Sequence, residues 1–101
     1  MDGMIFVGQT AVTFTATLGV DITGATCKIK YKKPDYSTGE FLATITDAAA
    51  GIIEYEVASA DDLNQKGDWI FWGYATFSNG KVAAGERYKI YVHQEGQQKQ
   101  I

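Results

Sequence analysis

The chain is poor in the residues on which disulfide frameworks, metal centres and hydrolytic sites usually depend. Its 101 residues include one cysteine, one histidine and one proline. Because Cys27 has no second cysteine to pair with, an internal disulfide is excluded, which fits folding in a reducing compartment. One cysteine and one histidine, His93, do not complete a tetrahedral zinc site of the usual soft ligands. We therefore expect no metal and no cofactor.

The sequence also lacks long apolar runs and a strong charge of either sign. No stretch approaches the roughly 20 unbroken apolar residues of a membrane span. The first ten residues, MDGMIFVGQT, contain no basic segment followed by a long apolar one, so we expect no signal peptide. A net charge of −3 is a poor match to the phosphate backbone of nucleic acid. We expect neither membrane insertion nor a nucleic-acid partner.

What the sequence does have is alternation of apolar and polar residues, in segments such as TAVTFTATL, ATCKIKYKK, GIIEYEV and RYKIYVH. Successive side chains of a strand point to opposite faces, so a period of two predicts half-buried antiparallel strands. The expected inward side chains of these segments are Val12, Phe14, Ala16, Leu18, Ala25, Cys27, Ile29, Tyr31, Ile53, Tyr55, Val57, Tyr88, Ile90 and Val92.

Turn signals separate these segments. Lys33-Pro34-Asp35 and Ser37-Thr38-Gly39 follow the lysine-rich segment, DAAAG separates FLATIT from GIIEYEV, and Asn79-Gly80 favours a tight hairpin. SADDLNQKG predicts one short helical turn near residues 60–65, with Ser59 as its cap.

About seven strands at this spacing predict an all-β fold, an immunoglobulin-like antiparallel β-sandwich, with a small β-barrel as the structural alternative. We expect a single domain over residues 1–93 and a polar, flexible C-terminal tail over residues 94–101.

One strand, in the stretch GDWIFWGYATFSNG, is apolar on both faces. We assign Trp69, Phe71 and Phe77 to the core. The opposite face then either packs under a loop or the N-terminal segment MIFVG, or forms an exposed patch that docks another subunit or a ligand. The candidate interface residues are Trp72, Tyr74, Tyr91 and Ile70.

No catalytic constellation stands out. The only histidine, His93, lies just before the polar tail, and no serine lies in a G-x-S-x-G elbow. The loop DLNQKG begins like a calcium loop, but Lys66 falls on a ligand position and Gly73 stands where a bidentate glutamate is needed. We expect the protein not to be an enzyme.

A row of lysines at positions 28, 30, 32 and 33 raises the question of a binding face. We interpret it as a solvated strand face with Glu54 and Glu56 as cross-strand partners, on a strand that alternating lysines protect from edge-to-edge aggregation.

Three segments in order, DITGATCKIKYKKPD (21–35), ATITDAAAGIIEYEV (43–57) and DDLNQKGDWIFWGYATFSNGKV (61–82), resemble the small immunoglobulin-like domains of tailed-phage proteins. The likeness is greatest to the N-terminal domain of the baseplate upper protein family. It implies a scaffold role, with Gly24 and residues 47–51 at turns and a core that includes Ile29, Ile45, Tyr55 and Trp69. Members of that family are generally longer, and Trp72 stands where a smaller or more polar outward residue is expected.

The resemblance implies a structural, non-catalytic phage or prophage protein of the tail, baseplate or virion surface, found in the virion after synthesis in the bacterial cytoplasm. Its partners would be other virion or tail proteins, or further copies of itself. The alternative is a carbohydrate- or host-surface-binding β-sandwich module, with a cell-surface glycan as partner, because aromatic side chains also stack on sugar faces.

Overall fold

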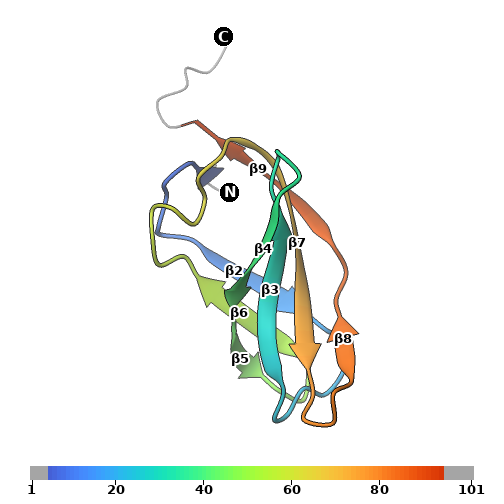
Figure 1. Cartoon of the computed structure of the whole chain (residues 1–101). Coiled ribbons are helices and arrows are strands. Elements are labelled where there is room, and N and C mark those ends of the chain that lie inside the picture. Colours follow the sequence, from blue (N-terminus) through green and yellow to red (C-terminus); the bar gives the residue numbers. More distant parts are fainter. Residues whose placement is uncertain (1–4, 95–101) are drawn as a thin grey trace.

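The computed structural model describes residues 5–94, which form nine strands in two packed β-sheets (Figure 1). Their bounds are β1 (Ile5–Phe6), β2 (Thr13–Thr17), β3 (Thr26–Lys32), β4 (Thr38–Leu42), β5 (Thr44–Asp47), β6 (Ile52–Glu56), β7 (Gly67–Thr76), β8 (Val82–Ala84) and β9 (Tyr88–His93). The six-stranded sheet has the order β1-β9-β7-β3-β4, with β8 paired to β7, and the three-stranded sheet has the order β2-β6-β5. The predicted all-β, immunoglobulin-like sandwich is confirmed.

The structure has more strands than the seven expected, partly because FLATIT is two strands rather than one. β4 ends at Leu42 in the six-stranded sheet, and β5 begins at Thr44 in the three-stranded sheet. Ala43 marks the crossing, where its backbone N–H donates to the carbonyl of Cys27 at 3.0 Å. More and less exposed positions keep alternating through the crossing, so the two-residue period does not reveal it.

The turns follow the expected signals with one shift. Asn79-Gly80 forms the predicted hairpin turn, in which the N–H of Gly80 donates to the Phe77 carbonyl at 2.9 Å. The turn after β3 spans residues 33–37 and is closed by the N–H of Lys33, which donates to the Ser37 carbonyl at 2.8 Å. Thr38 and Gly39, expected in that turn, instead begin β4 and pair with β3.

The core lies between the sheets and contains the alternating residues that the sequence indicated. Trp69 and Phe71 on β7 are fully buried, and Phe77 is half-buried against the core. Two aromatic stacks join the sheets: Phe14 lies 4.5 Å from Phe71 between ring centroids, and Phe41 lies 4.4 Å from Tyr55 with an interplanar angle of 6°.

The N-terminal segment lies at an edge of the larger sheet. β1 pairs in parallel with β9, placing Ile5 beside Val92 and Phe6 beside His93. The N–H of Val7 extends this pairing by donating to the His93 carbonyl at 2.8 Å. Ile5 and Val7 also pack against the core. The N-terminal segment therefore covers the edge of β9 that faces away from β7. The predicted flexible tail covers residues 94–101, of which all but Gln94 lie outside the described residues.

The predicted helical turn near residues 60–65 is wrong, because residues 59–63 form hydrogen-bonded turns instead. The carboxylate of Asp62 points back and accepts hydrogen bonds from the N–H groups of Ala58 and Ser59, at 3.0 and 3.2 Å. It also accepts one from the Tyr55 hydroxyl at 2.6 Å. These bonds fix the turn against the end of β6, which carries Tyr55.

These contacts set the ionisation of Asp62. Burial raises the pKa of Asp62, but the hydrogen bonds from Tyr55, Ala58 and Ser59 outweigh burial and hold its pKa below the ordinary value. A carboxyl whose pKa is lowered in the folded state adds stability above its unfolded pKa of about 3.9, and that stability is lost as the pH falls through the folded value.

We predict that Tyr55→Phe lowers the free energy of unfolding by about 1 kcal/mol at pH 7, because a charged acceptor loses a partly buried donor. The difference from the wild-type chain should shrink below about pH 3.5, where Asp62 is protonated in the unfolded chain and increasingly so in the folded one. Urea denaturation at pH 7 and pH 3 measures both values. An equal penalty at the two pH values would contradict the role of the ionised carboxylate.

Candidate interaction surface

The outer face of β7 carries the three apolar side chains Ile70, Trp72 and Tyr74, here called the β7 column. All three are half-buried, while their neighbours Trp69 and Phe71 point into the core. β7 lies in the middle of the larger sheet, between β3 and β9 (Figure 1). The column therefore runs along the centre of that face. The pattern of residues facing outward was predictable, since it follows from the two-residue period.

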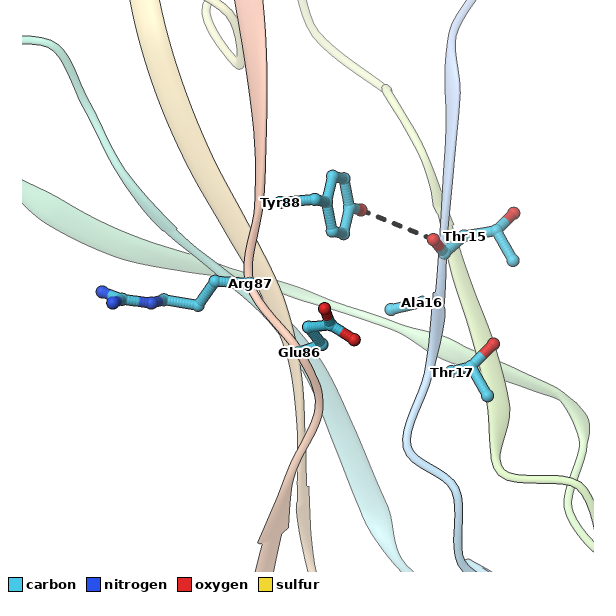
Figure 2. A pocket seen from close by; sticks show the side chains of 6 residues that line it. All are labelled: Thr15, Ala16, Thr17, Glu86, Arg87 and Tyr88. Atoms are coloured by element: carbon cyan, nitrogen blue, oxygen red, sulfur yellow. Dashed lines mark hydrogen bonds between the residues drawn. The ribbon is translucent and has the colours of Figure 1, made fainter.

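Basic side chains lie on both sides of the β7 column. On β3, Lys28, Lys30 and Lys32 stand opposite Tyr74, Trp72 and Ile70, in that order. On β9, Lys89 stands opposite Ile70. Arg87 precedes β9 and points away from the β2 residues 15–17 (Figure 2). The face is therefore an apolar column with a row of three lysines on one side and Lys89 on the other.

Tyr91, the remaining candidate, lies at one end of this face. It is opposite Asp68 on β7, 48% exposed, and in edge contact with His93 at a centroid distance of 4.6 Å. All four candidate interface residues thus share the outer face of the six-stranded sheet, although Tyr91 stands apart from Trp72 and Tyr74. The other expectation, that the N-terminal segment covers this face, does not fit the position of β1 beside β9.

The lysine row does not have the partners that the sequence suggested. Glu54 and Glu56 lie on β6 in the other sheet, and the ion pair on this face joins Lys28 to Glu40 of β4 at 2.5 Å. The Lys30 ammonium lies 3.7 Å from the ring centroid of Tyr74, a cation–π contact. β3 is an internal strand paired on both sides, so its lysines do not protect an edge.

Two shallow hollows border the β7 column. One, of about 320 Å³, lies beside Ile70 and Lys89, and the other, of about 220 Å³, lies beside Trp72 and Lys30. Apolar side chains beside such hollows, with charged groups around them, are typical of a surface that can receive a protruding group from a partner.

A third hollow, of about 270 Å³, lies between the sheets, where β2 faces residues 86–88. Figure 2 shows Tyr88 pointing from β9 toward β2, and its hydroxyl donates to the Thr15 carbonyl at 3.4 Å. Burial raises the pKa of Tyr88, so the phenol keeps the proton that it donates. The hollow is therefore a seam of the sandwich closed by a structural hydrogen bond.

The side chains of His93 and Cys27 lie in aromatic and apolar surroundings. His93 lies against the rings of Phe6 and Tyr91, with centroid distances of 6.0 and 4.6 Å. Cys27 is buried, and burial raises the pKa of its thiol. Within residues 5–94, no group of three or more His, Cys, Asp or Glu side chains could hold a metal ion. The same residues include no helix long and apolar enough to cross a membrane.

Comparison with known proteins adds no assignment: no family model matches the chain, and neither does any curated protein.

We predict that the two tryptophans of β7 differ sharply in their effect on stability. Trp69→Ala removes a fully buried side chain whose Nε1 donates to the Gln65 carbonyl, and should cost about 3–5 kcal/mol. Trp72→Ala, at a half-buried outer position, should cost roughly 1 kcal/mol or less and leave the fold intact. Urea denaturation of both variants measures the difference. A Trp72→Ala penalty as large as that of Trp69→Ala would make Trp72 a core residue.

Proposed function

We propose that this protein is a non-catalytic structural module that acts through protein–protein contacts, with the outer face of the six-stranded sheet as its interface. The β7 column carries this proposal. A rigid, internally paired strand presents Ile70, Trp72 and Tyr74 half-exposed along the middle of a sheet, which is a costly place to keep apolar groups in water.

The energetics suit a protein interface. Burial of apolar surface contributes roughly 25 cal/mol per Å², so covering the remaining exposed parts of two large aromatic side chains is worth several kcal/mol before the cost of association is subtracted. Aromatic side chains are among the types enriched at interface centres, whereas the rim of an interface is polar. Trp72 and Tyr74 fit such a centre, and the lysines beside them fit its rim.

We further propose that the module belongs to a phage or prophage particle, in its tail, baseplate or outer surface. The support is the resemblance of residues 21–82 to immunoglobulin-like domains of tailed-phage proteins, together with the sandwich fold that such a resemblance implies. Residues that the resemblance assigns to turns and core have those environments here: Gly24 and Gly51 adopt positive φ angles of 77° and 75°, and Ile29 and Trp69 are buried.

A carbohydrate-binding role is less well supported by the same face. Sugar rings stack on exposed aromatic faces, but the Lys30 ammonium occupies one face of Tyr74 at 3.7 Å. That leaves Trp72 as the principal stacking surface, and its side chain is half-buried, with Lys30 opposite it on β3. The arrangement favours a protein partner over a glycan.

We predict that mass spectrometry of purified phage particles, induced from the bacterium that encodes this chain, finds the protein at a stoichiometric ratio to a tail protein. The ratio would give the number of copies in the particle. Detection only in the lysate, and never in purified particles, would contradict the virion assignment. Isothermal titration against cell-wall polysaccharides would then test the glycan alternative, because a sugar binder needs no protein partner.

A further inference from the structure

The two outer faces of the sandwich carry opposite charge. The outer face of the six-stranded sheet is here called the basic face. Its strands carry four outward lysines, Lys28, Lys30, Lys32 and Lys89, and two outward acids, Glu40 and Asp68. The protein therefore concentrates positive charge on one side although its net charge is −3.

The outer face of the three-stranded sheet, here the acidic face, has the reverse character. Its outward positions carry Glu54 and Glu56 on β6 and Asp47 at the end of β5. Three threonines, at positions 13, 15 and 17, face outward on the neighbouring β2. None of the lysines or the arginine among residues 5–94 lies on β2, β5 or β6. The outer faces of a two-sheet sandwich point in opposite directions, so the basic and acidic faces are back to back.

We propose that the partner of the basic face is the acidic face of a second copy of this chain. This inference rests on the proposed function, in which the basic face is a protein interface, and it names the occupant. Complementary potentials bring the two faces together, with Lys30 and Lys32 meeting Glu54 and Glu56. The methyl groups of the outward threonines cover the β7 column.

The contact is heterologous, because each copy uses two different faces. A dimer formed in this way still offers one free basic face and one free acidic face, so further copies add head to tail, into a closed ring or an open row. A symmetric dimer would instead bury the same face of both copies and leave two identical faces free.

The contact is also small. The acidic face has three strands of five, four and five residues, so an interface limited to it falls below about 1,200 Å² in total. Association of this size is weak and, because it depends on exposed charges, sensitive to salt.

The test uses two variants of the complete chain, each with one face disabled. Lys30→Gln with Lys32→Gln removes charge from the basic face, and Glu54→Gln with Glu56→Gln removes it from the acidic face. Asp61→Asn is the matched control, because it neutralises an exposed acid outside the three-stranded sheet. Thermal unfolding checks that every variant is folded.

Sedimentation velocity over a range of protein concentrations gives the readout, at about 20 mM and about 500 mM salt, where the Debye length is about 20 Å and about 4 Å. The wild-type chain and Asp61→Asn should associate beyond dimers at low salt and dissociate at high salt. Each double variant alone should associate at least about tenfold more weakly. An equal mixture of the two should form a heterodimer and nothing larger, because only one intact pair of faces remains.

Several outcomes would overturn the inference. A wild-type chain that stays monomeric at both salt concentrations would assign the basic face to a foreign partner. If the double variant Glu54→Gln with Glu56→Gln associates as strongly as the wild-type chain, the acidic face is not the partner of the basic face. If the equal mixture of the two double variants forms no heterodimer, head-to-tail contact is excluded. None of these results alters the mass-spectrometric test of particles, so the two proposals fail independently.

Discussion

The structure depends on aromatic stacking across the space between its two sheets. Phe14 of β2 stacks on Phe71 of β7, and Phe41 of β4 stacks on Tyr55 of β6. With one cysteine and no disulfide, these contacts and the aliphatic side chains around them hold the sheets at a fixed separation. The rigidity of the outer faces follows from this packing. A sheet whose inner face is held by close contacts presents its outward side chains in a fixed arrangement.

The sequence predicted the faces of the strands better than their connections. A period of two identified the buried residues of β2, β3, β6 and β9, because burial on one side is a local property of an alternating strand. It did not reveal that the chain changes sheets at Ala43, since the same alternation serves a strand in either sheet. The helical turn was wrong because tertiary contacts decide this segment: Leu63 is buried in the core and its carbonyl accepts a hydrogen bond from the N–H of Gly8.

The candidate surface was predictable only in part, for a related reason. Trp72 and Tyr74 were identified from β7 alone, whereas the lysines beside them belong to a strand more than forty residues earlier in the chain. Pairing between distant strands decides which outward residues become neighbours, and nothing in a single strand encodes it. For that reason the sequence pattern predicted Glu54 and Glu56 as cross-strand partners of the lysines, although the fold places the two sets in different sheets.

The parallel pairing of β1 with β9 has a mechanical consequence. Tension applied to the chain before Ile5 and after His93 pulls the two strands in opposite directions along their common axis, because they run the same way. The hydrogen bonds between them, including the one from Val7 to His93, are then loaded together in shear rather than peeled apart one at a time. The sandwich therefore resists stretching at the place where its two ends meet.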